Sequence, residues 1–112
     1  MTNKFLPYGK HYIDQSDIDS VINTLKSNNL TQGPKIEEFE KLVASYCGVK
    51  YAVAVSSGTA ALHLCSIAAG LDNQSVSITS PITFVATANA VKYCGSNVDL
   101  IDINSETINI DE

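Results

Sequence analysis

The sequence predicts an α/β fold, and two features of its 112 residues lead to that prediction. Short apolar runs typical of strands occupy residues 51–55, 76–79 and 98–103, and segments with helical periodicity lie between them. The first of these runs is almost continuously apolar, which is typical of a parallel sheet that is covered on both faces. We therefore expect a mostly parallel sheet flanked by helices.

Two helices are expected before the first strand. Residues 1–13 are expected to be extended, and Asp14 can then cap a helix that has Asp17 at its third position. The apolar residues of this helix recur at helical spacing: Ile18, Val21, Ile22 and Leu25. Residues 27–33 are rich in turn formers and predict a loop.

The second helix is predicted to begin at Pro34 and to stop at Gly48. Proline suits the first helical position, and glycine is a common residue just after a helix. The apolar stripe of this helix consists of Ile36, Phe39, Leu42, Val43 and Tyr46. After the strand at 51–55, we expect helices over 59–69 and from about 84 to 93, each followed by one of the remaining strands.

The composition restricts the classes of partner. The formal net charge is −5, and all seven basic residues are lysines. Nucleic acids and anionic membranes bind clustered Lys and Arg, so neither is expected as a partner. No run approaches the roughly 18 apolar residues of a membrane span, and the N-terminus lacks the apolar core of a signal peptide. The three cysteines show no metal-ligand spacing, so we expect free thiols, no metal site and a cytoplasmic protein.

Residues 56–60 form the most informative motif of the chain. Ser56, Ser57 and Thr59 surround Gly58 between a predicted strand and a predicted helix. A helix start offers unpaired N–H groups and a partial positive charge, so small residues at this point predict a phosphate site. An ordinary capped turn explains the same residues. The motif is neither a Walker loop nor a dinucleotide fingerprint nor a nucleophile elbow.

Two further segments can contribute to a ligand site. Residues 79–89 follow the second predicted strand, and ligands of open α/β sheets bind at the carboxyl ends of strands. Phe84 can stack there on a planar ring held by the first turn, although a core aromatic is the simpler interpretation of this residue alone. The polar loop at 30–34 can touch a ligand or can merely precede a helix.

Three segments, in this order and spacing, resemble a known family. They are Leu30-Thr-Gln-Gly-Pro-Lys-Ile-Glu-Glu-Phe39, Ala52-Val-Ala-Val-Ser-Ser-Gly-Thr-Ala-Ala-Leu-His63 and Thr79-Ser-Pro-Ile-Thr-Phe-Val-Ala-Thr-Ala-Asn89. They resemble the DegT/DnrJ/EryC1/StrS sugar aminotransferases, which use pyridoxal 5′-phosphate (PLP). The third segment looks most like members that aminate C4 of a UDP-linked 4-keto-6-deoxy-N-acetylhexosamine. The resemblance implies the N-terminal part of an aspartate-aminotransferase-type (fold type I) enzyme that works as a homodimer.

The resemblance also implies roles for individual residues. Ser57, Gly58 and Thr59 would hold the phosphate of PLP, and Phe84 would stack on its pyridine ring. The UDP-linked 4-keto sugar would meet the following residues: Tyr8, Asn28, Asn29, Leu30 and Thr31. The amino donor would be glutamate.

No catalytic residue is expected within the chain. The family's Schiff-base lysine would lie beyond the last residue, and none of the seven lysines occupies its motif. Residues 1–33 would form an arm, a helix and the substrate loop, and residues 34–112 would form the first, truncated part of the PLP-binding major domain. The 112 residues alone are therefore expected to have no transaminase activity.

Two other functional interpretations remain open at the level of sequence. Sugar isomerase domains also hold phosphates with Ser/Thr-rich turns after strands, so a non-catalytic phosphosugar-binding module fits the motif at 56–60. Alternatively, the chain is an unstable truncated product, because in the family's sheet the strand at 51–55 pairs with strands that come later in the sequence.

Overall fold

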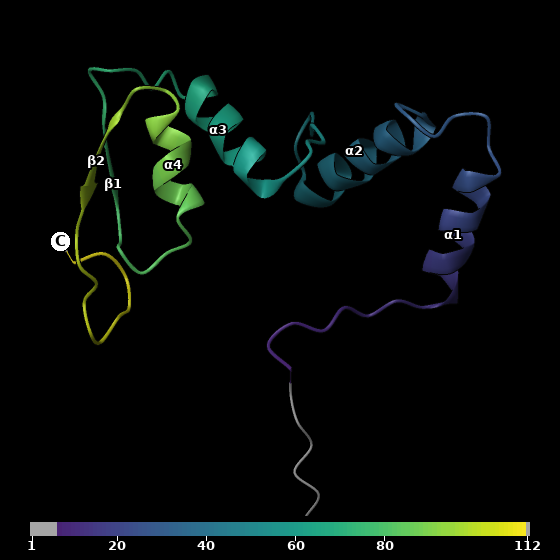
Figure 1. The fold of residues 1–112 in the computed structure, drawn as a ribbon, viewed down its shortest axis with the longest axis horizontal. Coiled ribbons are helices and arrows are strands. Elements are labelled where there is room, and N and C mark those ends of the chain that lie inside the picture. The colour runs from purple at the N-terminus through teal and green to yellow at the C-terminus, as the bar shows by residue number, and fades with distance from the viewer. Residues whose placement is uncertain (1–6, 112) are drawn as a thin grey trace, which may run out of the picture. The chain divides into compact units, whose positions relative to one another are not determined.

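The computed structural model describes residues 7–111 (Figure 1). The chain divides into two compact units, Met1–Ala54 and Val55–Glu112. The boundary predicted at residue 33 separates two segments with different expected functions, and it stays a prediction. Residues 1–6 of the expected extended arm lie outside the described residues, and residues 7–13 form neither helix nor strand.

The unit Met1–Ala54 contains the two predicted helices, α1 (Gln15–Leu25) and α2 (Pro34–Cys47). The Asp14 carboxylate accepts hydrogen bonds from the amides of Ser16 and Asp17, at 2.8 and 3.2 Å. The Asp17 carboxylate in turn accepts from the Asp14 amide at 3.0 Å, which completes the predicted capping box. The Ser16 hydroxyl bond, followed by these amide bonds, lowers the pKa of Asp14 below its ordinary value.

The ends of α2 also confirm the sequence prediction. Pro34 occupies the first helical turn, and Gly48 closes the helix with a left-handed φ of 65°. Just before α2, Gly33 lies so close to the backbone of Asn29 that a Cβ at position 33 would come within 2.8 Å of the Asn29 carbonyl oxygen. The loop between the helices therefore needs glycine at its last residue.

The unit Val55–Glu112 consists of α3 (Gly58–Ala68), β1 (Val76–Thr79), α4 (Ala86–Lys92) and β2 (Asn97–Leu100). The two strands pair in parallel, with Val76 opposite Asn97, and α4 packs against α3 and both strands. Small residues at the centre allow this close packing, because Ala86 and Ala90 are buried. The hydroxyl of the fully buried Ser96 lies 3.1 Å from the Ser75 carbonyl oxygen, so the polar atom at the centre is satisfied.

The strand predicted at 51–55 is wrong. Within residues 7–111 the strands are β1 and β2, and residues 51–55 are assigned to neither. A strand exists only where a neighbour pairs with its N–H and C=O groups, and here the Ala54 amide donates instead to a carboxylate oxygen of Glu40 at 2.8 Å. Tyr51 and Val53 are 74% and 76% exposed, so this apolar run is not buried as expected.

The last predicted strand is shorter than expected. Residues 98–103 were expected to form it, but β2 ends at Leu100. Ile103 instead makes an isolated bridge to Ile110, and the Asp111 amide donates to the Asp102 carbonyl oxygen at 3.0 Å. The chain turns back on itself over these residues, and the parallel pairing with β1 stops.

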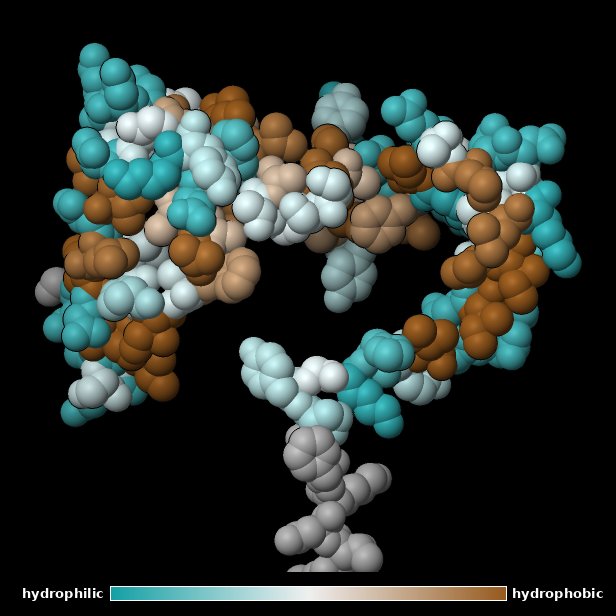
Figure 2. All heavy atoms as spheres, in the orientation of Figure 1, coloured by the Kyte–Doolittle hydropathy of each residue, from teal (hydrophilic) through white to brown (hydrophobic). Residues whose placement is uncertain are grey.

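The apolar stripes of α1 and α2 were placed correctly on the helices but are not covered. No residue of α1 is buried, and Ala44 is the buried residue of α2. Figure 2 shows the resulting concentration of hydrophobic side chains over α1. In the described part of the chain, no helix combines the length and the hydrophobicity that crossing a membrane requires.

Candidate functional site

The turn predicted to bind phosphate lies at the start of α3. Ser57 is the N-cap, with an extended backbone, and its hydroxyl oxygen accepts a hydrogen bond from the Ala60 amide at 3.1 Å. The Ser57 carbonyl oxygen accepts from the Ala61 amide, also at 3.1 Å. Ser57 therefore begins the helix in the ordinary way, while its hydroxyl proton stays available for another acceptor.

The two amides that follow Ser57 are available to a ligand. Among the hydrogen bonds of residues 7–111, none is donated by the Gly58 or Thr59 amide. A Cβ placed on Gly58 would meet no atom within 4 Å, so the space beside the Gly58 backbone is open. Unpaired N–H groups at an open helix start are the arrangement that binds a phosphate dianion.

The start of α3 and Phe84 line the same hollow of about 480 Å³, which lies wholly within the unit Val55–Glu112. Its lining residues are Gly58, Thr59, Ala61, Leu62, Cys65, Phe84 and Ala86. A hollow of this size falls within the range of small-molecule sites. Phe84 is 75% exposed, so its ring is not a core aromatic in this structure, and a face is accessible for stacking.

Short-range hydrogen bonds hold Phe84 in place between β1 and α4. The Ser80 hydroxyl accepts from the Ile82 amide at 3.0 Å, and the Phe84 carbonyl oxygen accepts from the Thr87 amide at 3.0 Å. The hydroxyls of Thr83 and Thr87 are also hydrogen-bonded at 3.0 Å. The polar residues on both sides of Phe84 therefore fix the turn that carries the ring.

The lining of this hollow has no charged side chain. Its attraction for an anion comes from the unpaired amides and the partial positive charge of the α3 N-terminus. The hollow is lined by no carboxylate, histidine or lysine that could act as a general acid or base. The described residues also contain no group of three or more His, Cys, Asp or Glu side chains that could hold a metal ion. The arrangement can bind an anion and stack a ring, and the Cys65 thiol is the ionisable group of its lining.

Sequence reasoning did not identify all the lining residues. Ala61, Leu62 and Cys65 follow Gly58 at intervals of three, four and seven residues, which places them on one face of α3. This spacing was visible in the sequence, and it gives the hollow an apolar wall.

The predicted substrate residues lie in the other unit, Met1–Ala54. Tyr8 is fully exposed in the segment before α1. Residues 28–31 are in the loop between α1 and α2, where the Ser27 hydroxyl donates to the Thr24 carbonyl oxygen at 2.7 Å and accepts from the Asn29 amide at 3.3 Å. Leu30 lines a second hollow, together with residues of α1.

Comparison with known proteins gives consistent matches over almost the whole chain. The chain is 47% identical over 107 residues to a UDP-4-amino-4,6-dideoxy-N-acetyl-beta-L-altrosamine transaminase of Campylobacter jejuni, an alignment that covers 96% of this chain and 28% of that protein. The PLP form of a sugar aminotransferase from Streptococcus pneumoniae superimposes with a TM-score of 0.87 at 27% identity, covering 95% of this chain and 27% of that one. Helicobacter pylori PseC, an aminotransferase involved in the biosynthesis of pseudoaminic acid, superimposes with a TM-score of 0.80 at 33% identity, over 90% and 28% of the two chains.

These matches establish the family and the fold. The chain spans about 28% of the length of the curated relative from Campylobacter jejuni. Its parallel strand pair and helices belong to the α/β fold of the PLP-dependent sugar aminotransferases, fold type I, as predicted. The model of the DegT/DnrJ/EryC1/StrS aminotransferase family matches residues 11–112, and the chain belongs to that family.

Proposed function

We propose that this chain provides the phosphate-binding turn and the ring-stacking residue of a PLP-dependent nucleotide-sugar aminotransferase. One observation carries the proposal: the open amides of Gly58 and Thr59 and the exposed ring of Phe84 line a single hollow. PLP is an anionic phosphate joined to a flat aromatic ring, so these two features match the two ends of the cofactor.

The chain's own residues would bind and orient the cofactor. The amides of Gly58 and Thr59 donate to the phosphate, and the hydroxyls of Thr59 and Ser57 can add further hydrogen bonds. Phe84 presents an apolar ring face, and Leu62 of α3 adds an apolar wall to the same hollow. Bound PLP supplies an electron sink for amino-group transfer, which no side chain can provide.

For the complete enzyme we propose amino transfer from glutamate to C4 of a UDP-4-keto-6-deoxy-N-acetylhexosamine. The name of the Campylobacter jejuni relative, a transaminase of a UDP-linked aminosugar, supports this substrate class. Tyr8 and residues 28–31 (Asn28, Asn29, Leu30 and Thr31) are the proposed sugar-nucleotide contacts, and the active form is a homodimer. We further propose a cytoplasmic location, in which Cys47, Cys65 and Cys94 stay as free thiols.

The proposal assigns binding, and not turnover, to these 112 residues. Amino transfer needs a lysine that bonds to the cofactor and moves protons, and none of the seven lysines matches the family's motif for it. We expect no amino transfer when the 112-residue chain is mixed with PLP, glutamate and a UDP-4-keto sugar. Product formation by the chain alone would contradict this division of roles.

Pyridoxamine 5′-phosphate is the best probe of the hollow, because it has no aldehyde that could react with the seven lysines. We expect it to bind the 112-residue chain in a calorimetric titration, while pyridoxamine, which lacks the phosphate, binds at least about tenfold more weakly. Phe84→Leu should weaken the binding of both compounds, since it removes the ring face but not the amides.

The same titration tests the alternative of a phosphosugar-binding module. If glucose 6-phosphate binds and pyridoxamine 5′-phosphate does not, then the turn is a sugar-phosphate site and the cofactor proposal is wrong. Equal binding of pyridoxamine and its 5′-phosphate would show that the amides of Gly58 and Thr59 do not hold the phosphate.

A further inference from the structure

A second hollow, of about 460 Å³, lies wholly within the unit Met1–Ala54. It is lined by Ser20, Val21, Thr24, Leu25, Leu30 and Lys35. Leu30 belongs to the loop proposed to contact the sugar nucleotide, while Lys35 lies in the first turn of α2. The hollow therefore joins the proposed substrate loop to the cationic side chain of Lys35, for which the sequence analysis predicted no role.

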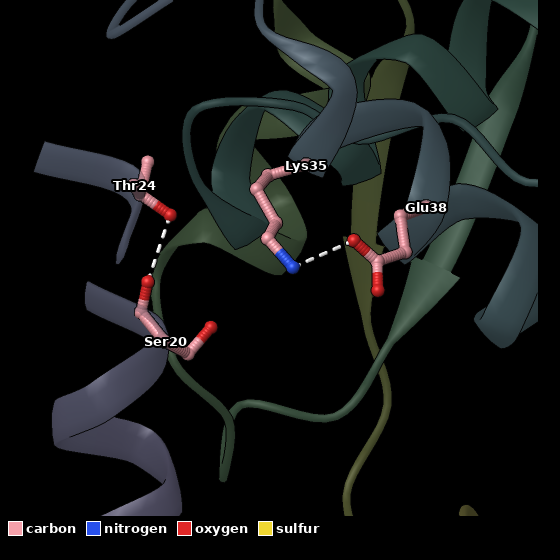
Figure 3. A network of polar contacts seen from close by, with 4 residues as sticks. All are labelled: Ser20, Thr24, Lys35 and Glu38. Carbon is pink, nitrogen blue, oxygen red and sulfur yellow. Dashed lines mark hydrogen bonds and ion pairs between the residues drawn. The ribbon is translucent and has the colours of Figure 1, made fainter. Parts of the chain in front are cut away.

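The walls of this hollow differ in chemistry. Val21, Leu25 and Leu30 provide an apolar surface of the kind that a flat base or a sugar ring covers. The Thr24 hydroxyl donates to the Ser20 carbonyl oxygen at 2.9 Å, as Figure 3 shows. The Ser20 hydroxyl takes part in none of the hydrogen bonds of residues 7–111, so it is a free donor at the edge of the apolar surface.

Lys35 is the cationic residue in the lining. Its ammonium group forms an ion pair with Glu38 at 2.7 Å, and the two side chains are 53% and 55% exposed (Figure 3). Exposed ion pairs contribute little to stability, so an anion of higher charge can replace Glu38 as the partner of Lys35. A diphosphate is such an anion, since it offers several acceptor oxygens to the three N–H groups of the ammonium.

We propose that Lys35 binds the diphosphate of a nucleotide-linked sugar, with the base or sugar lying on the apolar wall around Leu30. This inference rests on the proposed function, which supplies the nucleotide sugar. The chain contains no arginine, and Lys35 is the cationic side chain that lines this hollow. Lys35 thereby becomes a specificity-determining residue, because it distinguishes a diphosphate-linked sugar from a free one.

The test compares two lysines of α2 in the 112-residue chain. Lys35 and Lys41 are both exposed, and each forms an ion pair with a glutamate of the same helix, but Lys41 does not line this hollow. We expect Lys35→Gln to weaken UDP binding about tenfold at low salt, as measured by calorimetry, and Lys41→Gln to change it less than about twofold. Uridine, which has no phosphate, should bind both variants like the unmodified chain.

A gain-of-affinity variant makes the test independent of folding defects. Glu38→Gln removes the competing carboxylate, so UDP binding should tighten by about two- to threefold. If Lys35→Gln and Lys41→Gln weaken UDP binding equally, the effect comes from the general charge of the helix and the proposal is wrong. The proposal is also wrong if Lys35→Gln weakens the binding of uridine as much as that of UDP. Failure of the unmodified chain to bind UDP would also overturn it, while the pyridoxamine 5′-phosphate titration would report separately on the hollow at Gly58.

Discussion

Replacing Gly58 by alanine should improve folding and impair cofactor binding at the same time. Gly58 is the first residue of α3, it has no positive φ, and a Cβ there would meet no protein atom within 4 Å. Alanine therefore fits the folded backbone and restricts the unfolded one. We expect a gain of about 0.4–1 kcal/mol in the free energy of unfolding.

The cost of Gly58→Ala appears only when a ligand is present. The added methyl group points into space that the protein does not use, and in the proposed complex the phosphate needs that space to approach the amides of Gly58 and Thr59. Loss of one charge-assisted hydrogen bond costs about 1.5–3 kcal/mol. The affinity for pyridoxamine 5′-phosphate should thus fall about tenfold to a hundredfold.

Gly70, at the other end of α3, provides the matched control. Its φ is 75°, and a Cβ at Gly70 would also meet nothing within 4 Å, so alanine there is strained by its backbone alone. Gly70→Ala should destabilise the fold by about 1–2 kcal/mol and leave the affinity of the folded chain unchanged. Urea unfolding and calorimetric titration measure the two effects. If Gly58→Ala folds and binds pyridoxamine 5′-phosphate as tightly as the unmodified chain, the amides do not hold the phosphate.

Three further changes test the packing and capping contacts. Ser96→Ala should lower the free energy of unfolding by about 1–2 kcal/mol in urea denaturation, because the buried hydroxyl bonds to the backbone, and an unchanged midpoint would contradict this. Because the pKa of Asp14 is lowered in the folded chain, its carboxylate cap is fully present above about pH 5 and is lost as the pH falls through the folded-state pKa. The helix content measured by circular dichroism should therefore decrease at pH values under about 4. The decrease should be smaller in Asp14→Asn, and an equal decrease in both chains would contradict this. Glu40→Ala should speed amide exchange at Ala54, whereas Glu38→Ala should not, and equal exchange in both variants would show that the bond to Glu40 does not protect this amide.

The elements that were predicted well are those whose ends are fixed by near neighbours in sequence. The capping box of α1 joins residues three apart, and Pro34 and Gly48 fix the ends of α2 through their own backbone preferences. β1 was placed at its observed bounds, because Pro81 and the turn residues around it limit the run on one side. The strand expected at 51–55 failed because its partner cannot be read from the run itself.

The candidate site likewise has one part that the sequence predicted and one part that it left open. The Ser57-Gly58-Thr59 turn was visible in the sequence, since a small-residue helix start has a local cause. The position of Phe84 after the second predicted strand indicated that its ring could lie beside this turn, but a core position was the simpler interpretation of the residue alone. The packing of α4 against α3 makes the difference, because it brings the turn before α4 to the start of α3 and leaves the ring exposed.

The sequence by itself determined where the helices begin and end and which turn leaves its amides bare, because these depend on contacts within a few residues and on the steric limits of glycine and proline. Only the tertiary structure decided that residues 51–55 form no strand, that Ser96 is fully buried, and that Phe84 shares a hollow with Gly58. Strand pairing and hollows are formed by residues distant in sequence, and a local pattern cannot specify which distant residues will meet.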